Sequence, residues 1–157
     1  MNLVELAAIK KLPEFQYMDK QTCEWIENNN PNFINNPNSY ISIDLNNFSK
    51  FSLPVEWFLE KRIINSLHGY GHMMRCTIYS IYLTDYLKIG SEERTSLILA
   101  SSLHDIRRSN DKNDAEHGNR SASWVTENIQ IICKAFGIDL ISKNQLSSIE
   151  VAIQLSL

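Results

Sequence analysis

Residues 72–87 read HMMRCTIYSIYLTDYL, a stretch without proline or glycine. Its apolar side chains nearly encircle a helical projection, which is typical of a central helix in a bundle. Gly90 then predicts a helix stop, and Ser91 followed by two glutamates predicts the start of a second helix over residues 92–103. These two successive helices indicate an all-α fold.

Helical patterns also extend to both sides of this pair. Pro54 and the following VEWFLEKRIINSL predict a helix over residues 54–67, which HGYGH interrupts. After the second central helix, RRSNDKNDAEHGN is a polar loop. Asn119 or Arg120 opens the next predicted helix, which reaches about Phe136 and breaks at Gly137.

The last predicted helix begins with Ser147 as its cap and runs to the end of the sequence. It is amphipathic, with Ile149, Ala152, Ile153 and Leu157 on one side, and it has no C-terminal cap. We therefore expect the sequence to be a fragment of a longer protein. An exposed apolar face on this helix could drive formation of a homodimer.

The N-terminal third differs in composition from the rest. Residues 28–47 are rich in asparagine and contain Pro31 and Pro37, which oppose helix interiors and favour turns. Phe33 and Ile34 within this stretch suggest that it is pinned to the body. We predict an irregular N-terminal extension over residues 1–52, packed on a helical domain over residues 53–157.

Overall composition narrows the class of protein. The chain has 157 residues, 43% of them hydrophobic, and a formal net charge of -3, which suits one globular domain and disfavours nonspecific nucleic-acid binding. It contains no apolar run of the roughly 20 residues that span a membrane, and its start lacks the features of a signal peptide. The three cysteines are far apart, which suits reduced thiols in a cytoplasmic protein.

The four histidines mark the candidate site. His68 and His72 are four residues apart, His104 directly precedes Asp105, and His117 follows an acidic loop. Imidazole and carboxylate together form a mixed N/O ligand set that suits a divalent metal ion. Each histidine taken alone could equally be a helix cap or a partly buried packing residue.

The spacing of these residues resembles the HD superfamily of metal-dependent phosphohydrolases. Its elements here are H-x-x-R at His72–Arg75 and LHD at Leu103–Asp105. The longer blocks HGYGHMMR (residues 68–75) and ASSLHDIRRSNDKNDAEHGNRSASW (residues 100–124) are similar to a subgroup of uncharacterised bacterial HD-domain proteins. The resemblance covers residue 53 to the end of the sequence. It implies an HD-domain-like helical bundle.

The resemblance also implies a metal centre. Its ligands would be His72, His104 and Asp105, with Asp105 able to bridge two ions and His117 as an extra ligand. One or two ions of Mn, Fe, Mg, Ni or Zn would bind. His68 would contact the ligand side chains without binding the ion itself. The family's distal aspartate has no counterpart in an obvious matching context among the later acids, which are Asp111, Asp114, Glu116, Glu127, Asp139 and Glu150.

The implied chemistry is attack of a metal-activated water on phosphorus. Asp105, Arg75 and Arg108 are the predicted catalytic residues, and Arg75, Arg107 and Arg120 are predicted to bind the substrate. Each arginine could equally pair with an acid of the polar loop and fix that loop. Asp114 or Glu116 could hold the second ring nitrogen of a ligand histidine. Cys76 is predicted to be a small buried side chain.

Two functions remain open on the sequence. The first is a cytoplasmic phosphohydrolase that acts on a small molecule, a nucleotide or another phosphate ester. The second is a binding or regulatory module that keeps the helical scaffold without turnover. We expect no partnership with nucleic acid or membrane.

Overall fold

The computed structural model of the chain describes residues 51–156, and these are all-helical as predicted. Two short 3-10 turns, η2 (Val55–Trp57) and η3 (Lys61–Ile63), precede four α-helices. The helices are α4 (Tyr70–Tyr86), α5 (Ser91–Leu103), α6 (His117–Phe136) and α7 (Lys143–Gln154), and no strand occurs in this range. The predicted extension up to residue 50, including its asparagine-rich segment, lies outside the described residues.

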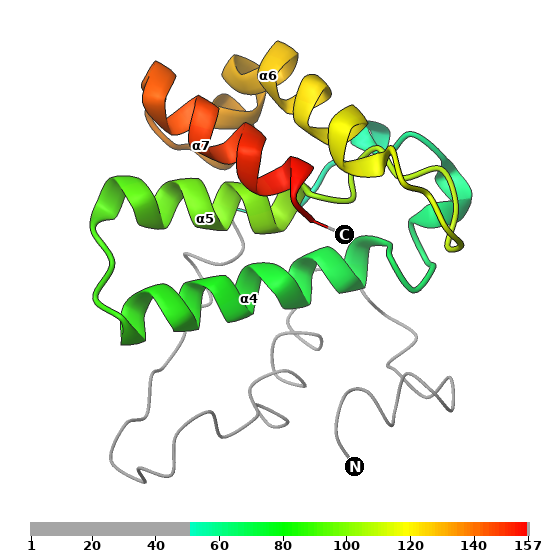
Figure 1. Cartoon of the computed structure of the whole chain (residues 1–157), viewed down its shortest axis with the longest axis horizontal. Coiled ribbons are helices and arrows are strands. Elements are labelled where there is room, and N and C mark those ends of the chain that lie inside the picture. Colours follow the sequence, from blue (N-terminus) through cyan, green and yellow to red (C-terminus); the bar gives the residue numbers. More distant parts are fainter. Residues whose placement is uncertain (1–50, 157) are drawn as a thin grey trace, which may run out of the picture.

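Helices α4 and α5 form the antiparallel pair that positions the site. Figure 1 shows them side by side, with α6 and α7 lying over α5 on the side away from α4. A hydrogen bond between the Ser80 and Ser101 hydroxyls joins α4 to α5, and an ion pair between Arg94 and Asp85 closes the turn that connects them. The antiparallel course places the first turn of α4 beside the last turn of α5.

The hydrophobic core fills the space between these layers. Its fully buried side chains come from every helix and include Met73 and Met74 of α4, Leu99 of α5, Ile132 of α6 and Ile149 of α7. Burial of both neighbouring methionines agrees with the near-encircling apolar pattern that predicted a central helix. None of the helices in residues 51–156 is both long and apolar enough to cross a membrane.

The predicted helix over residues 54–67 is wrong. Phe58 has an extended backbone, and its neighbour Leu59 donates a 3.2 Å hydrogen bond to the Ile106 carbonyl. Trp57 packs against the ring of Trp124, with 5.5 Å between the ring centroids. Trp57, Phe58, Ile63 and Ile64 are buried without a continuous helix, because tertiary packing outweighs local helix propensity.

The start of the last helix also differs from the prediction. Ser142, not Ser147, is its N-cap: the Ser142 hydroxyl accepts from the Gln145 amide, and the Gln145 side chain accepts from the Ser142 amide. This reciprocal pair is a capping box, and it satisfies two backbone donors that the helix leaves unpaired. The helix ends at Gln154, and Ile149 and Ile153 on its apolar face are buried in the core.

The remaining helix boundaries agree with the predictions within three residues. Helix α6 begins at His117 and ends at Phe136, and its C-cap Gly137 has a φ of 61°, the left-handed conformation that favours glycine. Gly90 precedes α5 as expected. The helix ends that carry the histidines are therefore close to where the sequence placed them.

We expect Gly69→Ala to destabilise the fold. A Cβ atom at Gly69 would lie 2.0 Å from the Ile63 carbonyl oxygen and 2.3 Å from that of Ile64, and backbone atoms have little room to move. The expected loss in the free energy of unfolding, measured in urea, is about 3 kcal/mol. Gly90→Ala is the matched control, since its Cβ would meet only the flexible end of Glu93. Equal stability of the two variants would contradict this reading of the structure.

Candidate metal centre

Four segments meet at a buried carboxylate. His72 lies in the first turn of α4, His104 directly follows α5, His117 opens α6, and His68 precedes α4. The side chain of Asp105 lies between them and its residue is only 1% exposed. The antiparallel pairing of α4 with α5 explains how residues 72 and 104 come into contact.

One oxygen of Asp105 faces three imidazoles. Its Oδ2 atom lies 3.3 Å from Nδ1 of His68, 3.7 Å from Nε2 of His72 and 3.5 Å from Nε2 of His104. His68, which the sequence placed outside the ligand set, is therefore as near to the carboxylate as the predicted ligands.

The other oxygen of Asp105 faces two different groups. Its Oδ1 atom lies 3.2 Å from Nε2 of His117 and accepts a 3.2 Å hydrogen bond from Nη1 of Arg108. The Arg108 guanidinium also donates to the carbonyl oxygens of Asn110 and Lys112 at 2.9 and 3.1 Å. Arg108 is buried and thus holds both the carboxylate and the polar loop in place.

Backbone carbonyls fix the orientation of two rings. Nδ1 of His104 lies 2.9 Å from the Ser101 carbonyl oxygen, and Nδ1 of His117 lies 2.5 Å from that of Asp114. A carbonyl oxygen only accepts, so each Nδ1 atom carries a hydrogen. In a neutral ring the Nε2 atom then presents its lone pair to Asp105. Burial lowers the pKa of His104 and favours that neutral form.

His72 brings another nitrogen close to His104 and Asp105. Its Nε2 atom lies 3.1 Å from Nε2 of His104, and burial, followed by repulsion from His104, lowers the pKa of His72 to about 4. At neutral pH, neutral imidazoles and a carboxylate thus converge. Such a group of electron-pair donors is stabilised by a cation between them.

The spacing of these donors fits one ion. Ligands of a four-coordinate zinc ion with bonds of 2.0–2.2 Å lie roughly 3.3–3.6 Å apart. The three separations among Nε2 of His72, Nε2 of His104 and Oδ2 of Asp105 are 3.1, 3.5 and 3.7 Å. These three residues could therefore hold a metal ion. Two overlapping groups could do so as well, namely His68, His72 and Asp105, and His72, Cys76 and His104.

Cys76 is the residue near the site that sequence reasoning missed. It lies one turn after His72 on α4, and its Sγ atom is 3.7 Å from Nε2 of His72. Burial raises the pKa of this thiol to about 11. The four-residue spacing from His72, the same spacing that drew attention to His68, was the available signal.

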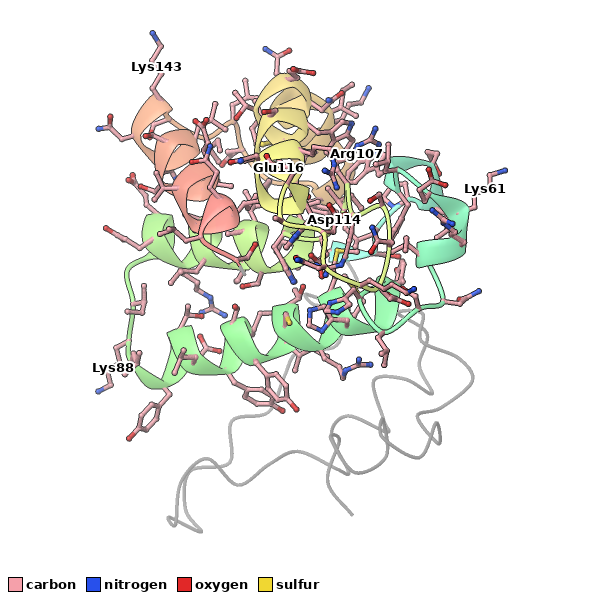
Figure 2. The ribbon with its side chains drawn as sticks, turned by 45° about the vertical axis from the view of Figure 1, so that its right-hand side comes forward. Lys61, Lys88, Arg107, Asp114, Glu116 and Lys143 are labelled. Atoms are coloured by element: carbon pink, nitrogen blue, oxygen red, sulfur yellow. The ribbon has the colours of Figure 1, made fainter. Side chains whose placement is uncertain are left out.

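The Asp114 carboxylate of the polar loop does not join the cluster. The Asp114 carboxylate accepts 2.8 Å hydrogen bonds from the amide and hydroxyl of Ser109 and 2.7 Å bonds from Arg120. Burial disfavours its charge, but these donors outweigh burial and hold the pKa of Asp114 well below its usual range. Asp114 orients His117 through its backbone carbonyl, not its side chain. Figure 2 shows Asp114 and Glu116 in the loop that leads into α6.

Two of the predicted phosphate-binding arginines make contacts within the chain. Arg107 donates from Nη1 to the Trp57 carbonyl oxygen at 3.1 Å and lies over the ring of Trp124. Arg120 pairs with Asp114 and donates to the carbonyl oxygen of Arg107 at 3.2 Å. Arg120 thus pairs with an acid of the polar loop, the alternative role expected of it, whereas Arg107 contacts Trp57 and Trp124 instead. The substrate-binding role of both stays a prediction.

Arg75 is placed differently. It lies on α4 between His72 and Cys76 and is half-buried. Burial has the largest effect on both neighbours, lowering the pKa of His72 and raising that of the Cys76 thiol. The positive charge of Arg75 lowers both pKa values. Among residues 51–156 it forms no ion pair with a carboxylate.

Comparisons of the chain with protein-family models, with curated proteins and with solved structures found no match. The candidate centre is therefore defined by its own geometry, and the resemblance to the HD superfamily stays a prediction.

We expect the purified chain to retain one or two divalent ions after loading with Zn²⁺ or Mn²⁺ and removal of the excess, as measured by elemental analysis. Asp105→Asn and His104→Gln should each lower metal affinity at least ~100-fold, because each removes a donor atom of the cluster. The exposed Asp139→Asn is the matched control and should bind like the wild type. Unchanged binding by Asp105→Asn would exclude this centre.

Without metal, stability should fall as the pH falls from about 6.5 to about 4. The pKa of His72 is about 4 in the folded chain against 6.5 for an ordinary histidine, so only the unfolded chain takes up this proton in that window. The free energy of unfolding then changes by up to about 1.4 kcal/mol per pH unit for one such group. Urea titrations in the presence of a chelator measure this slope.

His72→Gln should have a smaller slope over the same pH window, because it removes the group that takes up the proton on unfolding. A slope equal to that of the wild type would show that His72 is not the group responsible.

Proposed function

We propose that this chain is a metal-dependent phosphohydrolase that cleaves a small phosphate ester, such as a nucleotide, with a metal-activated water. The observation that carries the proposal is the Nε2 atom of His104, unprotonated because Ser101 holds the opposite ring nitrogen, aimed at the buried carboxylate of Asp105 and at His72. A cation between these donors would stabilise the arrangement, which lies at the junction of three helix ends.

The donor atoms narrow the choice of metal. Four imidazole nitrogens lie near the two carboxylate oxygens of Asp105. Imidazole suits Zn, Fe and Ni, whereas Mg²⁺ prefers oxygen ligands. Among the predicted ions, Mg²⁺ fits this site least.

Each residue of the centre has a role that follows from its contacts. His72, His104 and Asp105 would hold the ion, with His68 and His117 within reach of the same carboxylate. A divalent ion bound there lowers the pKa of a coordinated water and polarises a phosphoryl oxygen. Ser101 and the Asp114 carbonyl keep the rings of His104 and His117 turned towards the centre.

Arg75 is the arginine best placed to meet the phosphate. It lies one turn from His72 and has no carboxylate partner among the described residues, unlike Arg108 and Arg120. A guanidinium in this position would stabilise negative charge on the phosphoryl oxygens as it develops. Arg108 would instead act on Asp105, whose oxygen it contacts directly.

The alternative, a binding or regulatory module, has one observation in its favour. In residues 51–156, Asp105 supplies the only carboxylate of the candidate ligand groups, and Arg108 occupies its second oxygen. A centre with so few anionic ligands could bind metal and phosphate without turnover.

Phosphate release from a panel of nucleotides and simple phosphate esters, with Zn²⁺, Fe²⁺ or Mn²⁺, tests the proposal. We expect hydrolysis by the wild type and at least ~100-fold slower hydrolysis by His104→Gln and Asp105→Asn, since each loses a donor to the ion. Asp139→Asn should keep full activity.

Activity that survives Asp105→Asn would refute a reaction at this centre. Retained metal without phosphate release from any ester would favour the binding module.

A further inference from the structure

We propose that Cys76 is a metal ligand, which together with His72 and His104 makes this centre selective for thiolate-binding ions, Zn²⁺ above all, over Mn²⁺ and Mg²⁺. The inference rests on the metal-binding part of the proposed function and is independent of the reaction that follows. It assigns a role to a side chain that the phosphohydrolase proposal leaves unused.

The geometry of α4 brings the thiol to the histidines. Cys76 follows His72 by four residues, which places both side chains on the same face of the helix. The Sγ atom lies 3.7 Å from Nε2 of His72, the nitrogen that also faces His104. One ligand atom from each of His72, Cys76 and His104 lies within 4.8 Å of the others.

These separations suit a single ion with a sulfur ligand. A tetrahedral zinc ion with Zn–S near 2.3 Å and Zn–N of 2.0–2.1 Å keeps its sulfur and nitrogen about 3.6 Å apart. The observed 3.7 Å between Sγ of Cys76 and Nε2 of His72 agrees with that value. The two histidine nitrogens are 3.1 Å apart, close enough to share the same ion.

The fourth position would face Asp105. Its Oδ2 atom lies 3.7 Å from Nε2 of His72 and 3.5 Å from Nε2 of His104, so it can bind the ion or accept from a bound water. A thiolate also supplies the second anionic donor that no other acid of the described residues brings to the ligand groups. Because thiolates are soft ligands, this set favours Zn²⁺ and disfavours hard cations.

Cys133 provides the internal comparison. Its side chain is 1% exposed in the apolar core, as a packing cysteine is, whereas Cys76 is half-buried beside two imidazoles. Cys133 therefore serves as a control for Cys76, since only Cys76 lies where a metal ligand is expected.

The test is an optical titration of the full chain with Co²⁺, a spectroscopic substitute for Zn²⁺, with elemental analysis of the same samples. A bound thiolate produces a sulfur-to-cobalt charge-transfer band in the near ultraviolet, which nitrogen and oxygen ligands do not. We expect this band in the wild type, in Cys133→Ala and in Cys23→Ser, and its loss in Cys76→Ser. Zn²⁺ affinity should fall about 10–100-fold in Cys76→Ser, with Mn²⁺ affinity nearly unchanged.

A measurement on the wild type removes any dependence on folding of the variant. Zn²⁺ should protect Cys76 from alkylation, located by peptide mass spectrometry, while leaving the labelling of Cys133 unchanged. Bound Co²⁺ without the band, or with a band that persists in Cys76→Ser, would overturn the ligand role and leave the histidine–aspartate centre standing. Absence of bound Co²⁺ by elemental analysis would overturn both proposals.

Discussion

The buried carboxylate of Asp105 is the constraint around which the described chain is arranged. A charge removed from water needs partners. The Arg108 guanidinium lies 3.2 Å from one oxygen of Asp105, and four imidazole nitrogens lie 3.2–3.7 Å from the two oxygens, where they could share a cation with the carboxylate. They come from the start of α4, the end of α5, the polar loop and the start of α6. Moving any of these helix ends would leave the carboxylate without one of its neighbours, so the site and the packing of the bundle depend on each other.

The polar loop between α5 and α6 acts as a rigid support for this centre. Arg108 joins Asp105 to two loop carbonyls, and Arg120 joins the Asp114 carboxylate to the carbonyl of Arg107. Asp114 in turn fixes the His117 ring through its own carbonyl. Arg108 and Arg120 are thus engaged within the protein, whereas Arg75 on α4 pairs with no carboxylate of residues 51–156.

The two proposals meet at His72 and His104. These imidazoles have a carboxylate on one side and a thiol on the other, with Asp105 3.5 Å from Nε2 of His104 and Cys76 3.7 Å from Nε2 of His72. A centre of this composition would combine a soft anionic ligand with an oxygen that can hold a water. The identity of the metal and the reaction at the centre are thus separate proposals.

The local sequence pattern was sufficient to predict the central helices and the glycine that ends α6, because periodicity and caps depend on neighbours in the chain. It also marked the adjacent His104 and Asp105 as candidate site residues. The local pattern wrongly predicted a helix over residues 54–67. There the Trp57 ring packs against Trp124, and the Leu59 amide donates to the Ile106 carbonyl. The same limit applies to the site. The four histidines were evident as candidates, and the four-residue spacing of Cys76 from His72 was a local signal too. The nearness of His68 to Asp105 and the contact of Arg107 with Trp57 depend instead on which elements pack together. Such contacts join residues far apart in sequence, and no local pattern encodes them.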